Sequence, residues 1–181
     1  MRILGIDPGS KATGYGVVDR VDGRVVHVAH GTLRPPPSAP LAQRLARLCR
    51  DVAEVVAAHG PDVASVEQVF VAANPRSALV LGQARGAVLA ALGEAGLRVQ
   101  EYSTSAVKQA LTGSGAADKR QVQRMVRSAL SLERTPGSDA ADALALAICH
   151  ASAGRLAELG VRSRGGSRGA ARRSWDVRRA R

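Results

Sequence analysis

The chain has 181 residues, of which 45% are hydrophobic and only 2% aromatic, and its formal net charge is +11. This length favours a single domain with a short tail, and no apolar run reaches the roughly 18–20 residues that a membrane span needs. The N-terminus lacks the apolar region of a signal peptide, so we expect a cytoplasmic protein with no membrane partner. The excess of positive charge favours a polyanionic partner, either a nucleic acid or an anionic surface.

The N-terminal part of the chain predicts three antiparallel strands. An apolar run covers residues 2–7, a loop covers residues 8–14, and an extended pattern resumes at residues 15–18. Asp22-Gly23 is a strong hairpin signal between residues 17–21 and 24–29. The glycines of residues 9–16 lack the spacing of a nucleotide-binding P-loop, and we attribute them to a close backbone approach by a ligand.

Helical periodicity begins at Leu41 and ends at Gly60-Pro61. We then expect a strand at 63–69, a helix from Pro75 to about Leu92, a strand at 97–102 and helices at 103–111, 118–130 and 138–153. This order predicts an α/β fold with a mixed five-stranded sheet, in which the antiparallel meander is extended by crossover strands and flanked by helices. If the first and fourth strands are neighbours in that sheet, their C-terminal ends lie close together.

Four carboxylates stand where these elements begin or end, namely Asp7, Glu67, Asp139 and Asp142. Asp7 alone could form an ordinary turn, and Asp139 with Asp142 could cap a helix. Glu67 lies in an apolar strand, where a buried carboxylate needs a cation or a metal ion. Because carboxylates are the ligands that Mg²⁺ prefers, the four together predict a divalent-metal site that acts on a polyanion.

The C-terminal segment differs in composition from the rest of the chain. Residues 162–181 contain eight arginines and one acidic residue, a net charge of +7. We therefore predict a folded domain at residues 1–157 and an Arg-rich, disordered tail at residues 158–181 that could bind nucleic-acid phosphates.

Four sequence blocks, in this order, resemble the RuvC family of bacterial Holliday-junction resolvases, whose fold is ribonuclease H-like. The blocks are Ile6-Asp7-Pro8-Gly9-Ser10-x-x-Thr13-Gly14-Tyr15-Gly16, Glu67-Gln68-Val69-Phe70, Gly82-Gln83-Ala84-Arg85-Gly86 and Asp139-Ala140-Ala141-Asp142. The resemblance covers about residues 2 to 153. It implies a homodimeric endonuclease that nicks two opposing strands of a four-way DNA junction symmetrically, in recombination and repair, beside the branch-migration proteins RuvA and RuvB.

The resemblance also implies roles for individual residues. Asp7, Glu67, Asp139 and Asp142 would be the catalytic, metal-binding acids, holding two Mg²⁺ ions that Mn²⁺ could replace. How Asp139 and Asp142 divide that role is left open, because some relatives have a histidine at one of these positions. Four further residues would contact DNA: Lys108 and Lys119 at phosphate, Phe70 by stacking on a base, and Arg76 at phosphate.

Two other interpretations remain open at this stage. One is a different ribonuclease H-like enzyme, such as a sugar-kinase or actin-like ATPase or a nuclease that trims ribosomal RNA precursors. The other is a basic module that binds branched DNA without cutting it, although acids repel phosphate unless a metal ion intervenes. Small residues along the predicted helix at 75–92 make it our candidate for a dimer interface.

Overall fold

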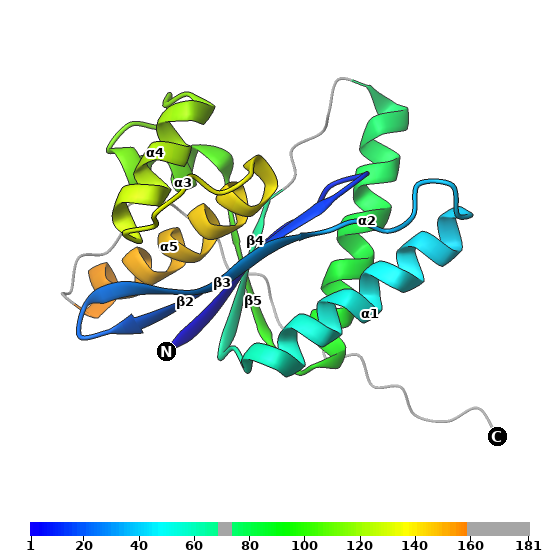
Figure 1. Ribbon diagram of the computed structural model, residues 1–181, viewed down its shortest axis with the longest axis horizontal. Helices are drawn as coiled ribbons and strands as arrows, with labels where there is room; N and C mark the ends of the chain where they lie inside the picture. The colour runs from blue at the N-terminus through cyan, green and yellow to red at the C-terminus, as the bar shows by residue number, and fades with distance from the viewer. Residues whose placement is uncertain (69–73, 159–181) are drawn as a thin grey trace, which may run out of the picture.

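The computed structural model describes residues 1–68 and 74–158, which form a central sheet with helices on both of its faces (Figure 1). The five strands lie in the order β3-β2-β1-β4-β5. The strands are β1 (Arg2–Asp7), β2 (Thr13–Val21), β3 (Arg24–Leu33), β4 (Val63–Glu67) and β5 (Arg98–Tyr102), and the helices are α1 (Leu41–His59), α2 (Pro75–Glu94), α3 (Thr104–Thr112), α4 (Lys119–Ala129) and α5 (Ser138–Glu158).

The sheet is mixed, as the sequence predicts. Strands β1, β2 and β3 form an antiparallel meander, and β4 and β5 extend it by parallel pairing next to β1. Positive φ angles of 48° at Asp22 and 74° at Gly23 form the tight turn between β2 and β3. The hairpin is longer than predicted, since β2 already begins at Thr13 and β3 continues to Leu33 around a bulge opposite Val17 and Val18. Strand β4 is shorter than predicted and ends at Glu67.

Helix α5 packs on one face of the sheet together with α3 and α4, and α1 and α2 cover the other face (Figure 1). Most residues of α5 from Ala140 to Ala151 are buried, because the helix packs against the sheet and also contacts α3 and α4. The buried hydroxyl of Ser65 in β4 donates a hydrogen bond of 2.9 Å to the carbonyl of Leu146. These contacts fix α5, and with it Asp139 and Asp142, against the strands.

Glycines in β1 and β2 let α5 approach the sheet unusually closely. A Cβ atom at Gly5 would overlap the carbonyl oxygen of Ala143, and one at Gly14 would overlap that of Asp139. At Gly16 a Cβ atom would lie 2.8 Å from the backbone nitrogen of Leu144. Our interpretation of Gly14 and Gly16 as part of a ligand-binding loop is therefore wrong, because both lie in β2 and make room for α5.

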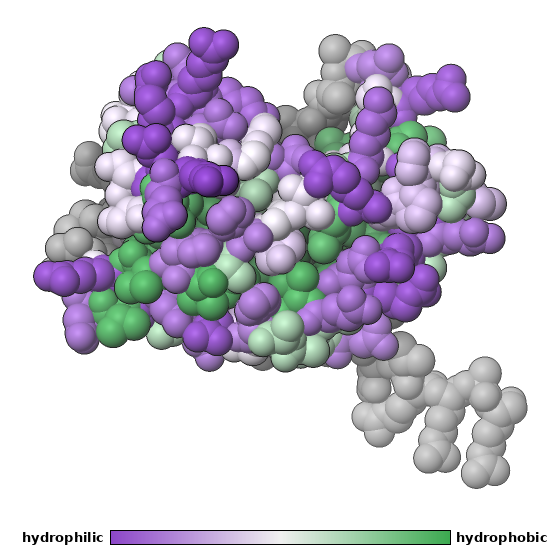
Figure 2. Space-filling view, in the orientation of Figure 1, coloured by the Kyte–Doolittle hydropathy of each residue, from purple (hydrophilic) through white to green (hydrophobic). Residues whose placement is uncertain are grey.

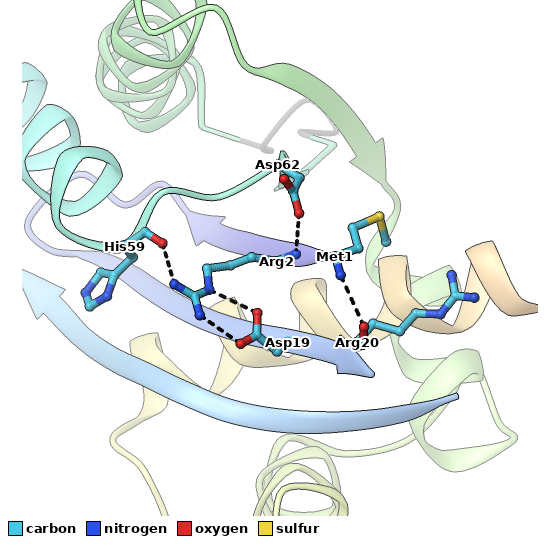
Figure 3. Close-up of polar contacts among 6 residues, drawn as sticks. All are labelled: Met1, Arg2, Asp19, Arg20, His59 and Asp62. Atoms are coloured by element: carbon cyan, nitrogen blue, oxygen red, sulfur yellow. Dashed lines mark hydrogen bonds and ion pairs between the residues drawn. The ribbon is translucent and has the colours of Figure 1, made fainter. Parts of the chain in front are cut away.

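Polar contacts of the first two residues anchor β1 at the end of the sheet opposite Asp7 (Figure 3). The Arg2 guanidinium donates to both carboxylate oxygens of Asp19, at 2.9 and 2.8 Å, and to the carbonyl of His59 at 2.8 Å. The backbone nitrogen of Arg2 donates to Asp62 at 2.6 Å, and that of Met1 to the carbonyl of Arg20 at 3.2 Å. The register of β1 between β2 and β4 is thus fixed from both sides.

Within residues 1–68 and 74–158 no helix is both long enough and apolar enough to cross a membrane. The predicted domain boundary at residue 157 falls in the last turn of α5, which ends at Glu158. The predicted basic tail lies outside the described residues from residue 159 onward.

Candidate active site

Asp7 and Glu67 lie side by side because they end neighbouring parallel strands. The ladder between β1 and β4 pairs Ile6 with Val66, so the next residue on each strand is one of the two acids. The C-terminal ends of the two strands therefore meet at one edge of the sheet, as expected if they are neighbours.

The start of α5 brings the other two acids to the same edge. Asp139 and Asp142 lie in its first two turns, and the backbone of Asp139 packs on Gly14, which is the partner of Asp7 in the sheet. A cleft of about 260 Å³ opens beside them. Its lining residues are Asp7, Glu67, Thr104, Val107, Lys108, Lys119, Val122, Asp142, Ala145 and Leu146.

Asp7 is the electrostatic centre of this group. Burial, followed by the charges of Glu67, Asp142 and Asp139 in that order, raises the pKa of its carboxyl group to about 7. Lys119 opposes it. A carboxylate held among three others in a partly buried position is unfavourable on its own, and a bound cation would relieve the repulsion.

The three other acids each contact a polar neighbour. The Asp142 carboxylate lies 3.0 Å from the ammonium group of Lys119, and that of Asp139 lies 3.6 Å from the guanidinium of Arg34. The hydroxyl of Thr104 donates a hydrogen bond of 2.6 Å to Oε1 of Glu67. The hydrogen bond to Asp142 raises the pKa of Lys119, and the charges of Asp142, Asp7 and Asp139 act in the same direction.

Among the described residues, no three acidic, histidine or cysteine side chains converge closely enough to hold a metal ion as they stand. The donor set nevertheless fits a hard divalent cation, because it consists of carboxylate oxygens alone and is repulsive around Asp7. A cation bound by Asp142 would repel the ammonium group of Lys119 beside it, so binding would favour release of the lysine side chain.

The predicted DNA-contacting residues fall into three groups. Lys108 in α3 and Lys119 in α4 line the cleft beside the acids. Arg76 is exposed in the first turn of α2 and is not among the residues that line this cleft. Phe70 lies outside the described residues.

Sequence reasoning did not identify Thr104 and Arg34, which contact two of the acids. Thr104 follows directly after Ser103, whose side chain caps α3. A short polar residue at the start of a helix that follows a strand is the sequence signal that could have identified Thr104. Arg34 follows the last residue of β3, two strands away from β1, and only the longer hairpin brings it to Asp139.

Comparisons with known proteins agree with this architecture. The family model described as crossover junction endodeoxyribonuclease RuvC matches residues 3–150. The crossover junction endodeoxyribonuclease RuvC of Burkholderia vietnamiensis is 50% identical over 181 residues, covering 100% of this chain and 98% of the relative. That of Halorhodospira halophila is 56% identical over 151 residues, covering 83% of this chain and 89% of the relative.

Solved structures show the same fold. Thermus thermophilus RuvC in complex with a Holliday junction substrate is 37% identical and superposes with a TM-score of 0.81, covering 89% of this chain and 97% of that one. With a family model spanning most of the chain and relatives near half identity over nearly all of it, the predicted resemblance is confirmed, and the chain belongs to the RuvC family of crossover junction endodeoxyribonucleases, with a ribonuclease H-like fold.

Proposed function

We propose that this protein resolves Holliday junctions by cutting two opposing strands of a four-way DNA junction in a reaction that depends on Mg²⁺. The observation that carries the proposal is that Glu67, Asp142 and Asp139 surround the partly buried Asp7, beside a cleft that also presents Lys108 and Lys119. The relatives named crossover junction endodeoxyribonucleases and the junction-bound Thermus thermophilus protein support the choice of substrate.

The four acids and the two lysines have separate chemical roles in this proposal. Asp7 and Glu67 end rigid strands, and Asp139 and Asp142 start a buried helix, so these four residues would hold up to two divalent cations. The bound cations supply Lewis-acid stabilisation of the charge on the scissile phosphate and lower the pKa of water. Lys119, released from Asp142, and Lys108 hold the phosphate and offset the charge that develops on it.

The experiment uses a synthetic four-way junction with each strand labelled in turn. With Mg²⁺ or Mn²⁺ we expect paired nicks at symmetric positions on two opposing strands, no cutting of linear duplex of the same sequence, and loss of cutting with a chelator. Binding without cutting in either metal ion would instead identify a junction-binding module that is not a nuclease. Cutting that persists with chelator would contradict the metal requirement.

Replacing Lys119 by methionine should slow junction cleavage about tenfold or more. It should also make the slope of log junction affinity against log salt concentration shallower, by the amount expected for the loss of about one phosphate contact. The side chain is 61% exposed and lies beside Asp142, so its loss should leave the fold intact. The measurements are the cleavage rate at saturating junction and junction affinity across a salt series. Arg24→Met is a matched control, because this exposed residue lies in the β2–β3 hairpin at the opposite end of the sheet. A Lys119 variant that equals the control in both measurements would rule out the phosphate contact.

A symmetric pair of nicks on a two-fold symmetric substrate is most simply made by a two-fold symmetric enzyme, and we infer a homodimer. Helix α2 supports this assignment. Leu79 is 63% exposed, and Cβ atoms at Gly82 and Gly86 would meet no atom of the described residues within 4 Å outside the helix's own backbone. We further infer that the protein acts in the cytoplasm with RuvA and RuvB.

Leu79→Glu should therefore shift the protein from dimer to monomer in light scattering coupled to gel filtration, because it places a charge in the proposed apolar contact. The control is Val26→Glu on the edge strand β3, where the wild-type side chain is 50% exposed. A dimer unaffected by Leu79→Glu would place the interface elsewhere.

A further inference from the structure

The main chain of Glu67 is held by the sheet and by α2. Glu67 pairs with Tyr102 of β5, and the next nitrogen, that of Gln68, donates to the Tyr102 carbonyl at 2.8 Å. Arg85 of α2, whose side chain is 18% exposed, lies 2.8 Å from the carboxylate of Glu101 and donates to the Glu67 carbonyl at 3.4 Å. The backbone of Glu67 is therefore fixed, and only the torsions of its side chain remain to be set.

Thr104, which also lines the cleft, contacts that side chain. Its hydroxyl donates to Oε1 of Glu67 at 2.6 Å, a length typical of a strong bond to an ionised acceptor. Thr104 is the first residue of α3, and the Ser103 side chain, which accepts from the nitrogen of Ala106 at 3.2 Å, fixes that helix start. The hydroxyl is thus carried by a rigid element, at a helix end whose dipole favours a carboxylate.

The bond restrains a carboxylate that has an acidic neighbour. Asp7 and Glu67 end adjacent strands and line the same cleft, so their carboxylates repel each other when both are charged. Partners that bind one atom of a metal-ligating carboxylate orient the group and typically change metal affinity by about 10–100-fold. Because Thr104 contacts Glu67 and not a reacting atom, its role in catalysis would be that of a positioning residue.

We propose that Thr104 positions Glu67 for divalent-metal binding, by engaging Oε1 and leaving the second carboxylate oxygen for the cation. The proposal rests on the proposed metal-dependent cleavage. It adds a residue from α3 to the machinery, so that the helix carrying Lys108 also orients an acid of the metal site.

The test compares Thr104→Val, which keeps the shape and removes the hydroxyl, with Thr104→Ser, which keeps the hydroxyl. Ser105→Ala is the control for an exposed hydroxyl on the same turn, since among the described residues that hydroxyl bonds to Ser103 alone, at 3.1 Å. Two quantities are measured. The first is the Ca²⁺ concentration that gives half of the full thermal stabilisation, which reports metal binding without cleavage. The second is the Mg²⁺ concentration that gives half-maximal junction cutting.

Thr104→Val should raise both concentrations about tenfold, while Thr104→Ser and Ser105→Ala stay within about twofold of the wild type. Junction affinity measured with chelator should be the same in all four proteins. Unchanged metal requirements in Thr104→Val, or an equal loss in Thr104→Ser, would overturn the positioning role. If the wild type binds Ca²⁺ but cuts no junction, the proposed function fails while the Ca²⁺ measurement still decides the role of Thr104.

Discussion

Asp7→Asn should raise the free energy of unfolding of the metal-free protein by about 2 kcal/mol near pH 8, even though it removes the central residue of the site. The physical reason is that the Asp7 carboxylate is partly buried and repelled by Glu67, Asp142 and Asp139. Asparagine has nearly the same shape and no charge, so the repulsion disappears with the substitution.

The pH dependence of this effect follows from the direction of the pKa shift. The pKa of Asp7 is raised from 3.8 to about 7 in the folded protein, so the folded state binds the proton more tightly than the unfolded state. The wild type therefore loses stability as the pH rises from about 4 to about 7, and the full penalty applies above that range. Below about pH 4 both states are protonated, and the variant should have no advantage.

Denaturant unfolding in the presence of a chelator, at about pH 4 and pH 8, measures this difference. Added Mg²⁺ should then make the wild type more stable than the variant, because it stabilises the wild type by mass action and binds the variant more weakly. Equal stabilities at both pH values would mean that Asp7 carries no unfavourable charge in the folded protein.

Gly5→Ala should destabilise the protein by about 3 kcal/mol or more, or prevent folding altogether. The added Cβ atom would overlap the carbonyl oxygen of Ala143 and lie 2.9 Å from the backbone nitrogen of Ala147, and a helix backbone cannot move aside as a flexible side chain can. Helix α5 would have to lift from β1, taking Asp139 and Asp142 away from Asp7.

Gly93→Ala near the end of α2 is the matched control. In the part of the chain that the structure describes, a Cβ atom there would meet no atom within 4 Å beyond the helix's own backbone, so alanine should stabilise the helix by about 0.5–1 kcal/mol. Thermal and denaturant unfolding of both variants measure the two effects. A Gly5 variant as stable as the control would show that the close packing of α5 on β1 is not required.

Much of the site follows from the sequence because the relevant acids lie on regular elements. Asp7 and Glu67 end strands whose apolar runs are readable, and parallel neighbouring strands bring their ends together. The start of α5 is equally readable from Asp139 onward, since an apolar helix must be buried on the sheet.

Contacts between distant side chains were not predicted. The carboxylate of Glu67 accepts a hydrogen bond from the hydroxyl of Thr104, 37 residues away in sequence. Such a contact depends on strand order and on side-chain torsions, neither of which a local pattern specifies. The glycines of β2 were misinterpreted for a related reason, because the backbone that they accommodate belongs to α5, more than a hundred residues later.

The most direct test of the central claim, that Asp7 organises a divalent-metal site for junction cleavage, is a comparison of the wild type and Asp7→Asn on one synthetic four-way junction. Cleavage is followed in Mg²⁺ at saturating protein, and junction affinity is measured separately with chelator. We expect the variant to bind the junction as tightly as the wild type and to cut it at least about a thousandfold more slowly. Cleavage by Asp7→Asn at a rate close to that of the wild type would contradict the account.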